Sequence, residues 1–260
     1  MSIDRRDSRQ ATAAARRVGG GDAAVQAYLL GLIDYADCLA LQQRLVYETA
    51  GRDDGLISLL ICEHPAIITI GRQGSRSHVH ISRRELISRR LELRWVNRGG
   101  GCLLHAPGQL AVYPIVPLEW HGFRVGDYLD RLQAGILAAL ADLRFQGRTC
   151  PQRFGVWGRS GQVAAIGAAV KNWTSYHGAY INVAPAMHVF RRIESDPEGG
   201  TEMTSLLAER GQPVRMSGVR EALVRRLSEA FGCARYHLFT GHPLLARPRG
   251  ATHESAARAG

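Results

Sequence analysis

The sequence predicts a single domain of the α/β (α+β) class, in which long helices pack against a mixed, largely antiparallel sheet. Two observations support this class. Segments with apolar residues at helical spacing alternate with shorter runs rich in apolar and β-branched residues, and no segment is repeated along the chain. A length of 260 residues, 45% of them hydrophobic, is sufficient for one sizeable core.

Helices are expected wherever apolar residues recur every three or four positions. Residues 34–49 have this pattern. It is strongest over residues 127–144, where Asp127 is expected to cap the N-terminus of the helix. Residues 81–92 and 217–231 are also expected to be helical.

Strands are expected where short apolar or β-branched runs end at glycine, proline or charged residues. These runs lie at residues 56–64, 66–71, 94–99, 110–118, 154–158, 162–170 and 175–183. The folded domain is expected to span residues 23–240. Residues 1–22 are rich in Arg, Ala, Ser and Gly without an apolar stripe, and residues 241–260 are similar, so both ends are expected to be loose tails.

The cysteines argue against a disulfide framework and against a zinc site. They are five in number, scattered, and show neither CxxC nor CxxH spacing: Cys38, Cys62, Cys102, Cys150 and Cys233. Free thiols in a reducing compartment are expected, with no metal and no cofactor. No run approaches the roughly 18 apolar residues of a membrane span, so no membrane contact and a cytoplasmic location are expected.

The chain is basic, with a formal net charge of +10. Its basic residues are almost all arginine, and Lys171 is the only lysine. Because the arginines are spread along the chain without a recognisable nucleic-acid-binding pattern, no nucleic acid partner is expected. An acidic protein partner fits this charge, and a monomer is the expected state.

Two segments combine glycine with histidine. NRGGGCLLHAPGQLAVYP has three successive glycines before His105, and consecutive glycines allow close approach of the backbone to a ligand. GQVAAIGAAVKNWTSYHGAYINVAP joins a strand of small residues to His177-Gly178, leaving room for a linear group. Gly-rich turns and small-residue strands also occur for packing alone, so each segment on its own leaves both readings open.

Taken in order, the segments closely resemble the lipoyl/octanoyl transferase family. The series is LGLIDYADCLALQQRL, LLICEHPAIITIGRQG, NRGGGCLLHAPGQLAVYP, GVWGRSGQVAAIG, SYHGAYINV and EMTSL, from Leu29 to Phe231. The resemblance implies the catalytic-domain fold of biotin and lipoate protein ligases. It also implies transfer of an octanoyl group from acyl carrier protein to a lysine of a lipoyl domain, in 2-oxoacid dehydrogenases or in the glycine cleavage H protein.

The resemblance also implies a substrate pocket with three walls. One wall is formed by Arg98, Gly99, Gly100, Gly101, Cys102, Leu103, Leu104 and His105; the second by Ala165, Ile166 and Gly167; the third by Gly178, Ala179 and Tyr180. The Arg98 guanidinium is expected to favour the thioester end of the substrate through charge-assisted hydrogen bonds. Ala106 stands where the family has a glycine, so either the turn has shifted or this position has an ordinary backbone conformation.

The two residues that perform the family's covalent chemistry are replaced. Asp196 occupies the position of the nucleophilic cysteine, and Gln162 the position of the lysine that lowers the thiol pKa. A carboxylate is a poor acyl nucleophile, and a neutral amide supplies no charge. Lys171 is nine positions beyond Gln162, roughly 30 Å along a strand, and is not expected to substitute.

Three functions remain open at this point. The first is an active acyltransferase, using either Cys150 as a displaced nucleophile or direct transfer assisted by His105 and Asp196. The second is a non-catalytic acyl- or acyl-carrier-binding protein that keeps the pocket without the chemistry. The third and weakest is a nucleotide-dependent ligase, because the related ligases also rely on the lysine that is Gln162 here.

Overall fold

The computed structural model describes residues 23–195 and 202–245. The strands are β1 (Ala24–Leu32), β2 (Ile57–Glu63), β3 (Ile67–Ile70), β4 (Glu92–Trp95), β5 (Cys102–His105), β6 (Gln109–Ile115), β7 (Arg148–Cys150), β8 (Arg153–Trp157), β9 (Gln162–Lys171), β10 (Thr174–Asn182) and β11 (Arg235–Thr240). The helices are α2 (Tyr35–Ala50), α3 (Arg83–Ser88), α4 (Val125–Asp142), α5 (Met187–Phe190), α6 (Leu206–Arg210) and α7 (Met216–Ala230), with 3-10 turns η2 (Arg76–His78) and η3 (Pro243–Leu245).

An eight-stranded sheet with the order β11-β1-β2-β6-β10-β9-β8-β7 forms the centre of the molecule. Strand β1 pairs in parallel with β2 and with β11, and the other neighbouring pairs in this sheet are antiparallel. A second sheet of three strands has the order β4-β3-β5. The expected mixed, largely antiparallel α/β architecture is therefore confirmed.

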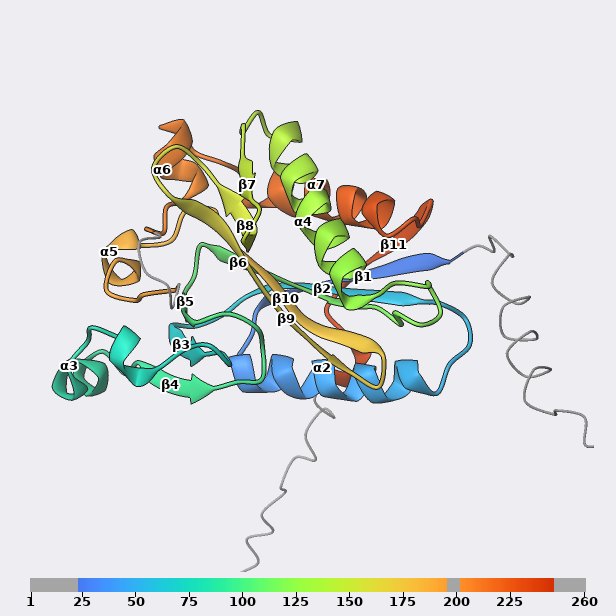
Figure 1. Ribbon diagram of the computed structural model, residues 1–260, viewed down its shortest axis with the longest axis horizontal. Coiled ribbons are helices and arrows are strands. Elements are labelled where there is room, and N and C mark those ends of the chain that lie inside the picture. The colour runs from blue at the N-terminus through green and yellow to red at the C-terminus, as the bar shows by residue number, and fades with distance from the viewer. Residues whose placement is uncertain (1–22, 196–201, 246–260) are drawn as a thin grey trace, which may run out of the picture.

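Helices cover both faces of the large sheet (Figure 1). Helices α4 and α7 lie together on one face, and α2 runs along the other, where the small sheet and α3 also lie. Each face has its own apolar core. Strand β6 shows the consequence, because Leu110 and Val112 belong to one core while Ala111 and Tyr113 belong to the other. A strand that is buried on both faces has a continuous apolar sequence, as in LAVYPIV.

Helix α4 starts earlier than its expected cap. It begins at Val125, and the N-cap position is Arg124 rather than Asp127. The Asp127 carboxylate sits in the first turn and accepts a hydrogen bond from the backbone N–H of Arg124 at 2.9 Å. An acidic side chain is favoured both at the N-cap and in the first turn, because in either place it can accept from the unpaired N–H groups of the helix end. The sequence therefore located the end of the helix but assigned the N-cap to the wrong residue.

The helix expected over residues 81–92 is shorter, ending at Ser88. Arg90 has a left-handed backbone with φ of 53°, which ends the helix before β4 begins at Glu92.

Strands β1 and β11, at one edge of the sheet, were not expected. At the C-terminal end, residues 241–245 lie within the described structure: Gly241 N–H donates to Leu29 O at 2.8 Å, and η3 follows. Residues 1–22 and 246–260 lie outside the described ranges.

The core of this fold depends on α4. We expect Ile136→Ala to lower the free energy of unfolding by about 2–5 kcal/mol, because Ile136 is fully buried between α4 and the sheet and its loss leaves a cavity. Ile87→Ala on α3, where the side chain is 69% exposed, should change it by less than about 0.5 kcal/mol. Urea denaturation midpoints measure both, and equal losses would contradict this assignment of the core.

Candidate functional site

A cavity of about 500 Å³ opens between α4, strands β8 and β9, and the loop before β5. Both glycine-containing sequence segments contribute to it. From the first segment it is lined by Arg98, Gly99, Gly100, Gly101 and Leu103, and from the second by Gln162, Ala165, Ile166, Gly167, Ala168, Ala169 and Val170. Two of the three expected walls therefore meet at one cavity.

These two walls touch through backbone that has no room for a side chain. The Gly99 N–H donates to Ala168 O at 2.9 Å. A Cβ at Gly167 would lie 2.7 Å from Gly99 O, inside any real contact distance. Glycine at position 167 is thus needed for the close approach of β9 to the loop, which is the physical reason for the AIG pattern.

The cavity wall is cationic and apolar. The side chains of Arg72, Arg98 and Arg153 line it, and no Asp or Glu lines it within the described residues. The apolar part of the lining comes from Val125, Leu129, Phe154, Trp157, Leu103 and Ile166. Such a lining suits a ligand with an aliphatic chain and an electron-rich oxygen at one end.

Arg98 has an exposure of 0%. It makes no ion pair with a carboxylate in the described part of the chain. Its Nη2 donates to Thr69 Oγ1 at 2.7 Å and to Thr69 O at 3.0 Å, and its Nη1 donates to Gly99 O at 3.0 Å. A buried guanidinium held only by neutral oxygens retains a strong attraction for an oxygen that carries negative charge.

A directional chain of hydrogen bonds holds Arg98 in place. Since Thr69 Oγ1 accepts from the guanidinium, its own proton is free for His105 Nε2, 2.8 Å away. His105 Nε2 is therefore the acceptor and Nδ1 carries the proton, which it donates to Gln109 Oε1 at 2.9 Å. These linked hydrogen bonds explain why arginine, histidine and glutamine occur in one motif.

These hydrogen bonds continue to residues of the other sequence motifs. Gln109 Nε2 donates to Asn182 Oδ1 at 2.9 Å, and Asn182 Nδ2 donates to Thr204 O at 3.0 Å. Thr204 N–H in turn donates to Gln162 O at 2.9 Å. Residues spread over the whole sequence thus form one buried polar network that ends at both sides of the cavity.

His105 does not act at the cavity itself, contrary to the expectation of an acid–base role. Its ring is 1% exposed, is stacked against Tyr35 at 5.3 Å, and is not part of the cavity lining. Burial, and then the neighbouring His64 and Arg98, hold its pKa well below the usual value, so the ring is neutral. His105 is a positioning residue that acts on Arg98 through Thr69.

Gln162, at the family's lysine position, lines the cavity at the start of β9. Its backbone is fixed on both sides, because its N–H donates to Glu202 O at 2.8 Å and its carbonyl accepts from Thr204. The side chain lies against Gly155, where a Cβ would come within 2.4 Å of Gln162 Nε2. The side chain thus brings a neutral hydrogen-bonding group, and no charge, to the cavity. Lys171, at the far end of β9, is exposed and outside the lining.

Asp196, at the family's cysteine position, lies outside the described residues. Its neighbour Ser195 lines the cavity, and the Ser195 hydroxyl is buried without a hydrogen-bond partner among the described residues. No sequence signal had singled out this serine, because one serine beside a charged residue is typical of any loop. It adds a hydroxyl to the cavity lining.

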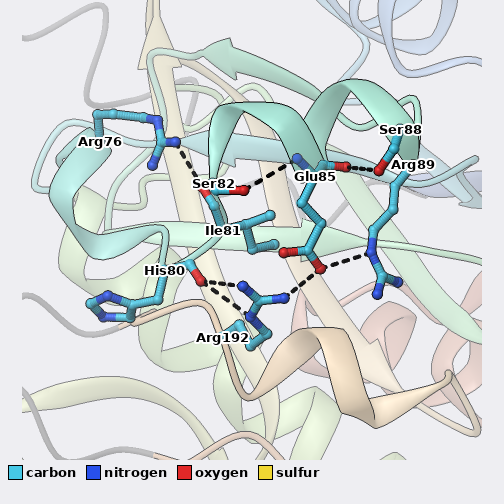
Figure 2. A network of polar contacts seen from close by, with 8 residues as sticks. All are labelled: Arg76, His80, Ile81, Ser82, Glu85, Ser88, Arg89 and Arg192. Carbon is cyan, nitrogen blue, oxygen red and sulfur yellow. Dashed lines mark hydrogen bonds and ion pairs between the residues drawn. The ribbon is translucent and has the colours of Figure 1, made fainter.

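The segment that leads to Ser195 is held by a network around Arg192 (Figure 2). The Arg192 guanidinium donates to the backbone oxygen of His80 at 2.7 Å and to the carboxylate of Glu85, which Arg89 also contacts at 2.9 Å. The hydrogen bond from Arg192 lowers the pKa of Glu85. Backbone bonds join the same segments, from His80 N–H to Arg192 O and from Glu194 N–H to His78 O. This network fixes the approach to the cavity.

Cys150 lies at the end of β7 beside the cavity, half-buried, and is not part of the lining. Its thiol donates to Gln152 Oε1 at 3.2 Å. The backbone N–H of Gln152, together with the side chain of Arg153, lowers the pKa of the thiol. Arg153 is the neighbouring cation, and it pairs with Cys150 across the β7–β8 turn.

Several residues expected in the walls lie behind the cavity instead. Cys102, Leu104, His105, Gly178, Ala179 and Tyr180 are buried and are not among its lining residues. The 178–180 segment belongs to β10, which pairs with β9 and is shielded by it. A Cβ at Gly178 would lie 2.2 Å from Val112 O, so glycine is needed there for packing against β6. The Cys102 thiol donates to Ser75 O at 3.3 Å, and burial raises its pKa.

The turn with Ala106 has not shifted. Ala106 is absent from the residues with positive φ, whereas Gly108 in the same turn has φ of 90°. A Cβ at Gly108 would also lie 2.7 Å from Ala184 O. Alanine is therefore tolerated at position 106, and the glycine that the turn requires is at position 108.

Comparisons with known proteins agree with this fold. Residues 34–228 match the family model described as the lipoyl protein ligase A/B catalytic domain. The chain belongs to this family. Among curated relatives, octanoyltransferases of Geotalea uraniireducens and Syntrophotalea carbinolica are each 36% identical; the alignments cover 74% and 75% of this chain and 86% and 89% of theirs.

Solved structures support the fold. The bipartite lipoate protein ligase of Thermoplasma acidophilum superimposes with a TM-score of 0.65 at 14% identity, covering 85% of this chain and 88% of that one. A lipoate protein ligase A bound with ATP gives a TM-score of 0.63 at 13% identity, covering 85% of this chain and 90% of that one.

Within residues 23–195 and 202–245, no helix combines the length and apolar character needed to cross a membrane.

The contact between the two walls can be tested at Gly167. We expect Gly167→Ala to push the 98–101 loop away from β9, because the added methyl group collides with Gly99 O. The hydrogen bond from Gly99 to Ala168 should weaken, and the Gly99 amide should then exchange its hydrogen faster by NMR or mass spectrometry. Gly218→Ala on α7, where the nearest atom would be 3.8 Å away, is the matched control and should leave this exchange unchanged. Unaltered exchange in Gly167→Ala would disprove the close contact.

Proposed function

We propose that this chain is an octanoyltransferase-like protein of lipoate biosynthesis that transfers an octanoyl group from acyl carrier protein to a lipoyl-domain lysine. The observation that carries the proposal is the cavity between the RGGG and AIG segments, with the buried Arg98 at its wall. A volume of about 500 Å³ is in the range for a small acyl ligand. The relatives named octanoyltransferase support the choice of acyl group.

In the proposed complex, the aliphatic chain lies against Leu103, Ile166 and Trp157, and the thioester carbonyl oxygen accepts a hydrogen bond from Arg98. Attack on the carbonyl carbon places negative charge on that oxygen. A guanidinium already fixed by Thr69 stabilises this charge without reorganising, which is the basis of oxyanion stabilisation. Arg98 would thus supply the positive charge that the family's lysine supplies and that Gln162 lacks.

The favoured route is direct transfer. In the described ranges no thiol lines the cavity, so a covalent thioester intermediate lacks a nucleophile there. The neutral amine of the acceptor lysine attacks the thioester carbonyl, the new C–N bond forms, and the C–S bond to the carrier breaks. By its position in the family pattern, Asp196 is the base that takes the proton from the amine, and the carrier's thiolate is protonated on leaving.

Two alternatives differ from this route in their products. In the first, Cys150 is acylated, because Arg153 and the Gln152 N–H favour its thiolate. In the second, the protein binds acyl carrier protein or its acyl group and transfers nothing. Incubation with octanoyl-acyl carrier protein and a lipoyl domain, followed by intact-mass spectrometry of both proteins, separates them: octanoyl on the domain only, a persistent adduct on Cys150, or no transfer.

Acyl carrier protein is acidic, and we propose that it binds to basic residues beside the cavity. The exposed Arg148 and Arg159 line a second hollow, which shares Arg153 and Trp157 with the cavity. We expect affinity for octanoyl-acyl carrier protein to fall as salt rises, and Arg148→Gln to weaken it by roughly twofold to fivefold at low salt. Arg44→Gln removes the same charge from α2 on the other face and should have no effect. Salt-independent binding, or equal effects of both changes, would refute this docking site.

The identity of the catalytic positions can be tested by restoration. The double change Asp196→Cys with Gln162→Lys should give a covalent octanoyl adduct at position 196, where the wild type gives none, because a thiolate and an ammonium would then meet at the cavity. Each single change should do much less, since one lacks activation and the other lacks a nucleophile. Peptide mapping after incubation with octanoyl-acyl carrier protein measures the adduct.

Two additions complete this experiment. Cys150→Ser in the same background removes the other exposed candidate thiol, so any remaining adduct belongs to position 196. Pro197→Gly restores the residue type that follows the cysteine in the family and frees the backbone φ. A folded variant with all four changes that stays unmodified would mean that the resemblance concerns the fold and not the acyl pocket.

A further inference from the structure

Three metal-ligand side chains meet inside the core below α2, away from the cavity. Cys38 comes from the first turn of α2, Cys62 from β2, and His64 from the end of that strand. The Cys38 and Cys62 sulfurs are 3.9 Å apart, and the Cys62 sulfur is 3.5 Å from His64 Nε2. All three ligand atoms lie within 4.8 Å of one another, and no other such group of three occurs within the described ranges.

These separations match the edges of a tetrahedral zinc site. With Zn–S bonds of about 2.3 Å and a Zn–N bond of about 2.0 Å, tetrahedral angles place two sulfurs about 3.8 Å apart and a sulfur about 3.5 Å from the nitrogen. Two of the three separations, 3.9 and 3.5 Å, agree with these edges, and the third, between the Cys38 sulfur and His64 Nε2, is within 4.8 Å. A disulfide would instead need the sulfurs to approach to about 2.05 Å, with a movement of α2 or β2.

The histidine is oriented as a metal ligand. His64 Nδ1 lies 2.8 Å from the backbone oxygen of Ile33, which can only accept, so Nδ1 carries the proton and Nε2 is the unprotonated nitrogen, whose lone pair accepts from the Tyr113 hydroxyl and would turn to a metal if that hydroxyl moved aside. A ring held by a backbone carbonyl at one nitrogen, with the other facing cysteine sulfur, is the arrangement found around metal-bound histidine. The Tyr113 hydroxyl, 2.8 Å from Nε2, provides an oxygen donor beside the fourth position.

The surroundings favour a dication with two thiolates. Cys38 and Cys62 have an exposure of 0% and His64 of 1%, so the site is shielded from bulk solvent, where two thiolates would cancel the charge of Zn²⁺. The Tyr35 ring contacts the His64 ring at 5.1 Å, so the cluster is enclosed by aromatic side chains.

We propose that Cys38, Cys62 and His64 bind one structural Zn²⁺ ion, with Tyr113 or a water molecule as the fourth ligand. Binding forms two Zn–S bonds and one Zn–N bond and releases the two thiol protons to solvent. The ion joins α2 to β2. Gln42 extends the connection, because its Nε2 is 3.7 Å from the Cys38 sulfur and its Oε1 accepts from the His177 N–H at 2.8 Å. The ion would thereby fix α2 against β10. This inference is independent of the proposed acyl transfer.

The metal must enter during folding, because all three ligands are buried. The full-length protein is therefore unfolded under reducing conditions with a chelator, desalted, and refolded with either one equivalent of ZnCl₂ or none. We expect about one zinc per chain by elemental analysis and a higher melting temperature in the zinc-refolded sample. Refolding with Co²⁺ should give sulfur-to-cobalt charge-transfer bands and the visible bands of a tetrahedral ion.

Variants show which residues hold the ion. Cys62→Ser and His64→Gln should lose the cobalt bands and the zinc, while Cys233→Ser, which removes a buried thiol outside this cluster, should keep both. If the cluster variants fail to fold, the wild-type cobalt spectrum still decides, since it reports thiolate ligation directly. Refolded wild-type protein without zinc and without charge-transfer bands, or a Cys38–Cys62 disulfide found by peptide mapping of the unreduced protein, would overturn the proposal.

Discussion

The buried positive charge of Arg98 is the constraint on which the rest of the site depends. An uncompensated guanidinium in a protein interior is costly, and here neutral oxygens alone satisfy its donors. Those oxygens must themselves be oriented, which requires Thr69 and His105 in one tautomer and Gln109 behind them. The residues that look catalytic in the sequence are therefore largely the support of one charge. Removing the Thr69 hydroxyl would take one acceptor from Arg98, and removing His105 or Gln109 would leave the orientation of that hydroxyl unfixed.

The sequence predicts much of this molecule because its strongest signals are local. The periodicity of α4 and α7 and the apolar run of β6 located these elements within a few residues, since burial on one or both faces dictates each pattern. Motif order also located the two walls of the cavity. Strands β1 and β11 were missed because partly exposed strands have a weaker pattern, and β11 is exposed along its length.

Relations between distant residues were beyond sequence reasoning. His105 looked like an acid–base candidate until its two ring nitrogens were found to be occupied. Cysteine spacing gave no sign of the contact between Cys38 and Cys62, because they are 24 residues apart and α2 and β2 bring them together only in three dimensions. In each case the deciding neighbour comes from another element, and chain separation carries no information about it.

The arginine-lined cavity has a further effect on any amine that enters it. Positive potential disfavours an ammonium ion, so Arg72, Arg98 and Arg153 would lower the pKa of an arriving lysine, with no carboxylate among the described lining residues to oppose them. The unprotonated form of an amine is its nucleophilic form. The field that holds the acyl oxygen would thus also convert the acceptor to its reactive state, which partly relieves the protein of the need for a strong base of its own.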